Sequence, residues 1–300
     1  MEKEIVLVAG GTGLIGQEIV RHFRAQGHEV RILSRGKTVV ETSVFHWNPA
    51  EEKIDSAALV GVTSIINLVG EGIADKRWTA DRKKEIIRSR VQPALFLASL
   101  APQIPTLRHY VSASGINCYG TQDAGQIFKE EDAYGNDFLS TVVQKWEAAA
   151  DAFQPYCKVS KIRISMVLSA KGGALETIIQ PMKFGFTSAF GTGKQWMAWI
   201  HLHDLARVFE FVIQHNCEGG FNVTGKLVNN QKFTQILAAT LGKKMWLPNV
   251  PSFVMKLVLG EMATVVLDGV QVSSEKLKDL GFQYEFEELK DALQDLRGSK

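Results

Sequence analysis

Closely spaced glycines near the start of the chain have the pattern of a phosphate-binding turn. The residues are Gly10, Gly11, Thr12, Gly13, Leu14, Ile15 and Gly16. The first glycine of such a turn permits a tight bend, the fourth residue lets the backbone approach a pyrophosphate, and the last lets a helix pack on a sheet. The positive end of the following helix attracts phosphate oxygens. The motif therefore predicts a dinucleotide site rather than an ordinary glycine-rich turn.

The end of the second predicted strand indicates which dinucleotide is bound. The strand Val30–Leu33 is followed by Ser34 and Arg35, with Lys37 close by. An NAD site usually has Asp or Glu here, which accepts from the ribose hydroxyls. A hydroxyl and a cation instead suit a 2′-phosphate, and no carboxylate at this position repels it. This favours NADP(H) over the alternative in which Arg35 is merely exposed.

Alternating apolar strands and amphipathic helices supply the elements that must position these residues. The expected strands are Ile5–Ala9, Val30–Leu33, Ile65–Val69, His109–Ser112 and Val159–Val167, with Phe221–Val223 as a further one. The expected helices between them follow Leu14 up to Gly27, run from about Thr79 to Leu100, and run from the N-cap Asp137 to Phe153. This alternation predicts an α/β protein with a doubly wound, Rossmann-type parallel sheet.

The pattern loosens after about Gly172, and the rest of the chain is mostly helical. Helices are expected at about Leu202–Gln214, Gln231–Leu241, Ser252–Leu267, Ser274 to near Gly281, and Phe286–Leu296. The apolar run within Ser252–Leu267 contains Lys256 and Glu261, which predicts a packed helix rather than a membrane span. We expect residues 1–170, joined by about 195–225, to form an NADP-binding Rossmann domain. Residues of about 171–194 and 226–300 are expected to form a smaller substrate lobe.

Composition excludes several other classes of protein. The chain has 300 residues, is 45% hydrophobic and has a net charge of +2, so nothing marks it as a nucleic-acid binder. Its three cysteines are far apart, which argues against a disulfide framework and a structural zinc site. No signal-peptide pattern precedes the first strand. We therefore expect a cytoplasmic protein with a small-molecule substrate, no metal, no nucleic-acid partner and no membrane partner, and leave a homodimer open.

The chain resembles the extended short-chain dehydrogenase/reductases, the group of NAD(P)-dependent sugar-nucleotide epimerases and dehydratases. More narrowly, it is similar to an atypical branch called epimerase family proteins. The matching segments are Gly10–Gly16, Asn67–Glu71, Trp78, Ser89–Arg90, Ser112–Gly115, Tyr119–Gly120, Asp137–Leu139, Trp146–Glu147, Gly172–Gly173, Trp199–His201 and Asp204. They run nearly from end to end, and their order and spacing together are specific.

The resemblance implies further contacts with the cofactor. They are Ser34 and Arg35 for the adenosine phosphate, Leu68, Val69 and Gly70 for adenine or ribose, Glu85 and Arg90 on the long helix, and Val167 at the nicotinamide. An arginine at position 90 could reach a diphosphate or a substrate anion. Without the resemblance, Arg90 would be read as a surface arginine of a helix.

One departure from the family concerns proton transfer. Working members use Tyr-x-x-x-Lys on a helix, where the tyrosine is the general acid/base and the lysine lowers its pKa and binds ribose. Here Trp146-Glu147 sets the register and puts Leu139 and Val143 at those two positions, where neither can transfer a proton. Lys145 is two residues out of register, and a shift to it would put Thr141 in the place of the tyrosine.

Two hypotheses for function follow. In the first, the chain is an NADP(H)-dependent oxidoreductase or epimerase-like enzyme with non-standard acid/base residues. Ser114, which matches the family's upstream serine, would bond a substrate oxygen, and Arg90 or an ordered water would supply the electrostatics. In the second, the chain is a non-catalytic protein that senses NADP(H), or uses it structurally, and acts through a protein partner. The intact glycine turn favours the first, and the lost dyad favours the second.

Other residues with chemical potential have plainer alternatives. His201 and His203 have a spacing seen in metal sites, but no neighbouring carboxylate or cysteine completes a ligand set. Asp204 is expected at the N-terminus of the helix that starts there. Trp78 and Trp199 could line a pocket for a planar ligand or pack in the core.

Overall fold

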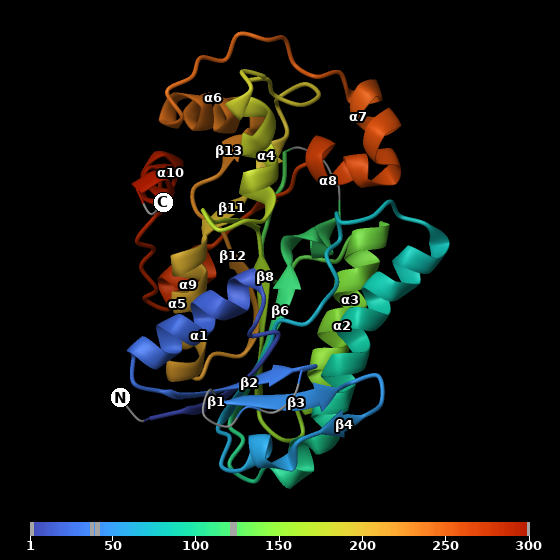
Figure 1. The fold of residues 1–300 in the computed structure, drawn as a ribbon, viewed down its shortest axis with the longest axis vertical. Helices are drawn as coiled ribbons and strands as arrows, with labels where there is room; N and C mark the ends of the chain where they lie inside the picture. Colours follow the sequence, from blue (N-terminus) through green and yellow to red (C-terminus); the bar gives the residue numbers. More distant parts are fainter. Residues whose placement is uncertain (1–2, 37–38, 40–42, 121–124, 299–300) are drawn as a thin grey trace.

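The computed structural model describes residues 3–36, 39, 43–120 and 125–298, and a single large sheet lies at their centre (Figure 1). The order of its strands is β12-β8-β6-β5-β1-β2-β3-β4. The strands are β1 (Ile5–Ala9), β2 (Glu29–Ser34), β3 (Val44–Asn48), β4 (Lys53–Ile54), β5 (Ser64–Asn67), β6 (His109–Gly115), β8 (Lys158–Ile164) and β12 (Gly219–Val223). All neighbouring pairs are parallel except β3 and β4. The predicted doubly wound, Rossmann-type sheet is confirmed.

Helices cover both faces of this sheet (Figure 1). They are α1 (Leu14–Ala25) and α5 (Leu202–Gln214) on one face, and α2 (Ala80–Leu100) and α3 (Phe138–Ala150) on the other. The side chains of β1 alternate between the two: Val6 and Val8 belong to the core with α1 and α5, whereas Leu7 belongs to the core with α2. Because both faces are covered, β1 is apolar without interruption, as its sequence predicts.

Polar caps fix where the two long helices begin. The Thr79 side chain accepts a hydrogen bond from the Arg82 N–H at the start of α2. The Asp137 carboxylate accepts one from the Ser140 N–H at 2.8 Å at the start of α3. Each cap satisfies an N–H group that has no partner inside the helix. Both predicted helix starts are therefore confirmed.

A mostly helical region lies beyond the carboxyl ends of the strands (Figure 1). Its helices are α4 (Ala174–Lys183), α6 (Asn230–Thr240), α7 (Ser252–Leu259), α8 (Thr264–Leu267) and α10 (Leu289–Gly298). Short paired strands accompany them: β9 (Met166–Leu168) with β11 (Trp199–His201), β10 (Trp196–Met197) with β13 (Val228–Asn229), and β7 (Ile127–Phe128) with β14 (Gln271–Val272). Helices α4, α6 and α10 share a core with Trp199. Helix α9 (Glu275–Asp279) lies instead against β12, in the core that contains α1 and α5.

The C-terminal segment is bound to α5 through a buried carboxylate. Asp204 is fully buried and accepts hydrogen bonds from the backbone N–H groups of Glu285 at 3.0 Å and Phe286 at 2.8 Å. Arg207 donates to the same carboxylate at 2.6 Å. Asp204 does lie in the first turn of its helix, as predicted. Its second role, holding the segment that leads into α10, was not predicted.

The prediction of one packed helix over Ser252–Leu267 is wrong. The segment breaks at Gly260, which has a φ of +62°, and a 3-10 turn separates α7 from α8. Glycine adopts this left-handed conformation readily, so the helix can stop there at little cost. No residue of α7 is buried. Arg77 instead holds its end by donating to the carbonyls of Leu257 and Val258, at 2.8 and 3.0 Å.

Within the described residues, no helix combines the length and the apolar character that crossing a bilayer requires.

Candidate functional site

The glycine turn joins β1 to an open helix end. Gly10 has a φ of +83°, and its carbonyl accepts a hydrogen bond from the Gly13 N–H at 3.1 Å, which closes the turn. A Cβ on Gly16 would overlap the Gly10 carbonyl oxygen and lie 2.6 Å from the Cα of Gly11. Helix α1 has no side-chain cap and no acidic residue in its first turn. Its free N–H groups and positive dipole are therefore available to an anion.

The predicted nucleotide contacts gather around this turn because β1, β2 and β5 are neighbours. The Leu68 N–H donates to the Ala9 carbonyl at 2.9 Å, and the Leu68 backbone lies 3.2 Å from where a Cβ of Gly10 would be. Ser34 ends β2 and accepts from the Gly36 N–H at 3.1 Å. Arg35 follows it and is exposed. Lys37 lies outside the described residues.

The loop after β9 approaches the turn between β1 and α1. Val167 is half-buried in β9 and packs against the core that contains α1. A Cβ on Gly173 would lie 3.1 Å from the Leu14 side chain at the start of α1. The glycine pair after β9 therefore lies next to the turn between β1 and α1.

Arg90 is buried, which contradicts the reading as a surface arginine. It is 9% exposed, and its guanidinium lies 5.1 Å from the centre of the Trp146 ring. It donates to the carbonyls of Glu71 at 2.9 Å and Ile86 at 3.0 Å. A Cβ on Gly70 would come within 2.9 Å of the guanidinium carbon, so the turn after β5 closes over this side chain. Burial lowers the pKa of Arg90 to about 10, so the group stays charged near neutral pH.

Glu85 has a different environment from Arg90. Its carboxylate accepts from Arg82 at 2.6 Å, and this bond lowers its pKa. Arg82 and Glu85 line an open groove at the start of α2, with Lys76, Arg77, Thr79, Asp81 and Arg88. Glu85 and Arg90 are thus turned to different partners, and the predicted cofactor contact of Glu85 stays a prediction.

Ser114 forms part of a buried ionic cluster. Its hydroxyl donates to Glu147 at 2.5 Å, and the Tyr134 hydroxyl donates to the other carboxylate oxygen at 2.6 Å. Arg163 contacts the same carboxylate through two nitrogens, at 2.9 and 3.0 Å. Burial alone would raise the pKa of Glu147, but the hydrogen bond and charge of Arg163, with the bonds from Ser114 and Tyr134, outweigh it and hold that pKa below its usual value.

The buried ionic cluster also includes Tyr119. Arg163 also donates to the Tyr119 hydroxyl at 2.8 Å, and this hydroxyl donates to Asn222 on β12 at 2.8 Å. The sequence singled out Glu147 only to set the register of α3. The sequence could have indicated that Glu147 has a cationic partner, because it lies among the buried residues of that helix and a buried carboxylate needs one. Nothing in the sequence identified that partner as Arg163.

The dyad positions are apolar and enclosed. Leu139 and Val143 are 9% and 5% exposed on α3, and Val143 packs against Cys118 and Tyr119. Lys145 is exposed on another side of the helix, as its register predicts. Neither a tyrosine nor a lysine therefore occupies these two positions of α3.

The remaining candidates serve as structural contacts. Trp199 is fully buried, and its indole N–H donates to the Lys226 carbonyl at 2.9 Å. Trp78 packs edge-on against Phe138 with ring centres 5.0 Å apart. His201 accepts from the His203 N–H and so caps α5. Among the described residues, no group of three metal-ligating side chains is assembled.

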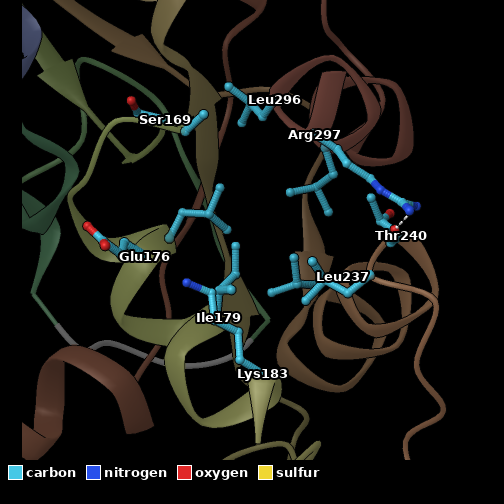
Figure 2. A pocket seen from close by; sticks show the side chains of 12 residues that line it. Ser169, Glu176, Ile179, Lys183, Leu237, Thr240, Leu296 and Arg297 are labelled. Atoms are coloured by element: carbon cyan, nitrogen blue, oxygen red, sulfur yellow. Dashed lines mark hydrogen bonds between the residues drawn. The ribbon is translucent and has the colours of Figure 1, made fainter. Parts of the chain in front are cut away.

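A separate cavity of about 70 Å³ lies between α4, α6 and α10 (Figure 2). Its lining residues are Ser169, Ala170, Leu175, Glu176, Ile179, Lys183, Leu237, Thr240, Leu241, Leu293, Leu296 and Arg297. Aliphatic side chains such as Leu237 and Leu296 form most of the interior, and Arg297 is turned to the Thr240 carbonyl. None of the predicted site residues is among them.

Comparison with known proteins decides the family. A family model described as the NAD dependent epimerase/dehydratase family matches residues 6–224. The chain belongs to this family. A second model, described as a domain of unknown function, matches residues 250–296. The predicted resemblance to extended short-chain dehydrogenase/reductases is thereby confirmed.

Several relatives of this epimerase/dehydratase chain match it nearly end to end. An Arabidopsis thaliana protein named "Epimerase family protein SDR39U1 homolog, chloroplastic" is 35% identical over 96% of this chain and 85% of the relative. The crystal structure of human epimerase family protein SDR39U1 (isoform 2) with NADPH has a TM-score of 0.88 and 30% identity, and covers 99% of this chain and 100% of its own. A nucleoside-diphosphate sugar epimerase from Corynebacterium glutamicum has a TM-score of 0.80 and 27% identity, over 98% of this chain and 58% of its own.

The role of Ser114 in this epimerase/dehydratase family member can be measured. Its only proton is donated to Glu147, so it is not free for a substrate oxygen while that bond persists. We expect Ser114→Ala to lower the free energy of unfolding by about 1.5–3 kcal/mol, the range for a bond to a charged group. Urea unfolding measures this. Ser112→Ala is the control, because Ser112 is buried on the same strand but donates to a neutral carbonyl. Equal losses in the two variants would contradict the expectation.

Proposed function

We propose that the chain binds NADP(H) at the turn between β1 and α1. The observation that carries this proposal is the uncapped end of α1 beside Ser34 and the exposed Arg35. The helix end suits a pyrophosphate, and the hydroxyl and guanidinium suit the 2′-phosphate of the adenosine ribose. The human relative, whose crystal structure contains NADPH, adds support because the similarity includes nearly the whole of both chains.

The residues of the turn fit such a group. A Cβ on Gly13 would meet only the Gly10 carbonyl oxygen, at 3.5 Å, so the outer side of the turn is open to a pyrophosphate. Leu68 offers an apolar side chain next to the turn, where a base or ribose could pack. Because Gly70 has no side chain, the guanidinium of Arg90 can pack directly against the turn that follows β5.

We further propose that the chain is an oxidoreductase or epimerase-like enzyme that acts on a small substrate with non-standard acid/base residues. When bound, the nicotinamide would give or accept a hydride. Arg90 would contribute a buried positive charge that stabilises negative charge on a substrate. Ser114 would have to exchange its bond to Glu147 for one to the substrate, or act as an acceptor.

An oxidation assay tests this activity. The purified chain would be loaded with NADPH and offered a panel of aldehydes, ketones and nucleotide sugars, and the absorbance of the reduced nicotinamide would be followed. We expect substrate-dependent loss of absorbance with at least one compound class. Gly13→Ala, which we expect not to bind the cofactor, gives the background rate. An epimerase-like reaction returns the hydride and leaves the absorbance unchanged, so the nucleotide sugars are also analysed for epimerised product. Tight NADPH binding with neither oxidation nor epimerised product across the panel would overturn the proposed activity and leave the binding proposal intact.

A second candidate is a non-catalytic protein that senses NADP(H), or uses it structurally, and acts through a protein partner. The observation in its favour is the pair Leu139 and Val143, which are enclosed and cannot move a proton. The same assay separates the candidates, because this one requires cofactor binding with no turnover. Limited proteolysis with and without NADPH would then report whether the cofactor changes the exposed surface.

Cofactor choice gives a further prediction. Arg35→Ala is expected to weaken NADPH binding by about 10- to 100-fold, which corresponds to the loss of a hydrogen bond to a charged group. NADH binding should not change, since NADH has no 2′-phosphate. Fluorescence titration with both cofactors measures this, with the exposed Arg88→Ala as the control. Equal losses for NADPH and NADH would show that the 2′-phosphate is not bound by Arg35.

A further inference from the structure

Large apolar side chains project into solvent at one end of the molecule. Phe184 and Phe186 follow α4, Trp246 lies between α6 and α7, and Phe253 and Leu257 lie on α7; they are 78%, 61%, 71%, 71% and 76% exposed. We call these five residues the aromatic edge. Figure 1 shows the loop ends after α4 and α6, and α7 itself, at the upper end of the molecule, beyond the sheet. Few soluble surfaces expose so many large apolar groups together without a function.

The two loops of the aromatic edge are held in place by hydrogen bonds. The Trp246 indole N–H donates to the Gly185 carbonyl at 3.1 Å, between the two phenylalanines in sequence. The Thr187 hydroxyl donates to the Lys244 carbonyl at 2.6 Å, and the Val250 N–H donates to the Ala189 carbonyl at 2.8 Å. Residues 185–191 therefore lie alongside residues 244–250, and their aromatic side chains are presented outward by a paired backbone.

The charge around this edge has one sign. Residues 177–203 contain two lysines and residues 219–260 contain five, and neither stretch contains an aspartate or a glutamate. Those that flank the aromatic edge in sequence are Lys183, Lys194, Lys243, Lys244 and Lys256. None of them forms an ion pair with another described residue, whereas lysines elsewhere in the chain do, such as Lys161 with Asp151. Lys256 does interact electrostatically with Asp268, but the edge as a whole combines apolar side chains with an excess of lysines.

The combination of apolar side chains and lysines indicates which kind of partner binds the aromatic edge. A second copy of the chain placed symmetrically on this edge would set lysines against lysines, and the nearby Glu261 and Asp268 already interact with Lys83 and Lys256 of their own chain. A nucleic acid would match the charge but would leave aliphatic residues such as Leu257 and Val258 without an apolar partner. An anionic bilayer offers both partners, since aromatic rings settle at the boundary of the hydrocarbon and lysines reach the phosphates.

We propose that the aromatic edge docks the protein on the surface of an anionic lipid bilayer. The aromatic and α7 side chains enter the headgroup boundary, and the lysines contact the lipid phosphates with their stems along the apolar surface. The sequence led us to expect no membrane partner because no segment spans a bilayer. Docking on the surface requires no spanning helix. The exposed apolar side chains and the lysines therefore lead us to replace that expectation.

Co-sedimentation of the full chain with lipid vesicles tests the proposal. We expect the chain to sediment with vesicles of mixed phosphatidylglycerol and phosphatidylcholine, and not with phosphatidylcholine alone. Binding should fall as salt is added, since the screening length shortens from about 10 Å at 0.1 M to about 3 Å at 1 M. Lack of binding to the anionic vesicles, or equal binding to both kinds, would overturn the proposal.

Variants locate the bound surface. Trp246→Ser is expected to weaken vesicle binding about ten-fold or more, and Lys244→Gln and Lys256→Gln about five-fold each. The matched controls are Val60→Ser and Lys84→Gln, which are equally exposed on the Rossmann half and should bind as the unchanged chain does. Thermal unfolding checks that each variant is folded. Unaltered binding of the three edge variants would place the contact elsewhere and overturn the proposal, as would a dimer in gel filtration that Trp246→Ser dissociates without any vesicle binding.

Discussion

Gly16→Ala is expected to destabilise the protein by about 1–3 kcal/mol or more and to abolish NADPH binding. The added methyl group would overlap the Gly10 carbonyl oxygen and crowd the Cα of Gly11. Both are backbone atoms of the same turn, so no side chain can rotate away to make room. The turn must open, which separates the N-terminus of α1 from the end of β1. Urea unfolding and NADPH titration measure the two effects.

Gly13→Ala is the matched control for this prediction. Gly13 has a φ of −76°, which any residue adopts, and its added methyl group would meet only one atom, at an ordinary 3.5 Å. The unfolding free energy without cofactor should therefore stay within about 0.5 kcal/mol of the original. NADPH binding should still be lost, because the methyl group occupies the side of the turn that a pyrophosphate approaches. Normal NADPH binding by Gly13→Ala would show that the pyrophosphate lies elsewhere.

Arg163→Met is expected to cost about 3–5 kcal/mol of stability, because it breaks a buried ion pair by removing one partner. The variant leaves Glu147 buried with only the Ser114 and Tyr134 hydroxyls as partners. An ionised carboxylate that has lost its cation in the interior is poorly compensated. Lys161→Met is the control, since Lys161 lies on the same strand but pairs with the more exposed Asp151, and it should cost no more than about 1 kcal/mol.

The pH dependence of this variant supplies an independent readout. In the unchanged protein the folded pKa of Glu147 is below its unfolded value of about 4.3. Its contribution to stability is therefore present above that unfolded value and is lost as the pH falls through the folded pKa. In Arg163→Met, only the Ser114 and Tyr134 hydroxyls still oppose burial, so the pKa of Glu147 is expected to rise and acidification should recover part of the lost stability. Parallel pH profiles for the two proteins would contradict this account.

The elements around the cofactor site could be predicted because their signals are local. Strand β1 is an uninterrupted apolar run that ends at glycine, and α5 coincides with its predicted bounds. Helix α4 was missed although Leu175, Ile178, Ile179 and Met182 have helical spacing, because the helix has only ten residues and contains Pro181. The break after α7 was missed because its apolar pattern continues past Gly260, and only the backbone conformation of that glycine marks the interruption.

The candidate site likewise contains some features that depend on short motifs and others that depend on contacts between distant parts of the chain. The glycine turn and Ser34-Arg35 are short motifs, so the sequence alone predicts their chemistry. The burial of Arg90 could not be inferred, because it depends on the Gly70 turn, which comes from another part of the chain and folds over it. The pairing of Glu147 with Arg163 likewise depends on the packing of α3 against β8. Such pairs need the tertiary structure before their partners can be named.

The position of β12 has a consequence for biosynthesis. Strand β8 pairs with β6 on one side, but its other neighbour, β12, follows only after β9, α4, β10, β11 and α5 have been made. A nascent chain that has just completed β8 therefore carries an open sheet edge, with unpaired N–H and C=O groups that can recruit another chain. During this interval the Tyr119 hydroxyl also lacks its acceptor, because Asn222 lies on β12 and has not yet been made. Residues up to Val223 must leave the ribosome before the protein can close its own sheet and protect itself from aggregation.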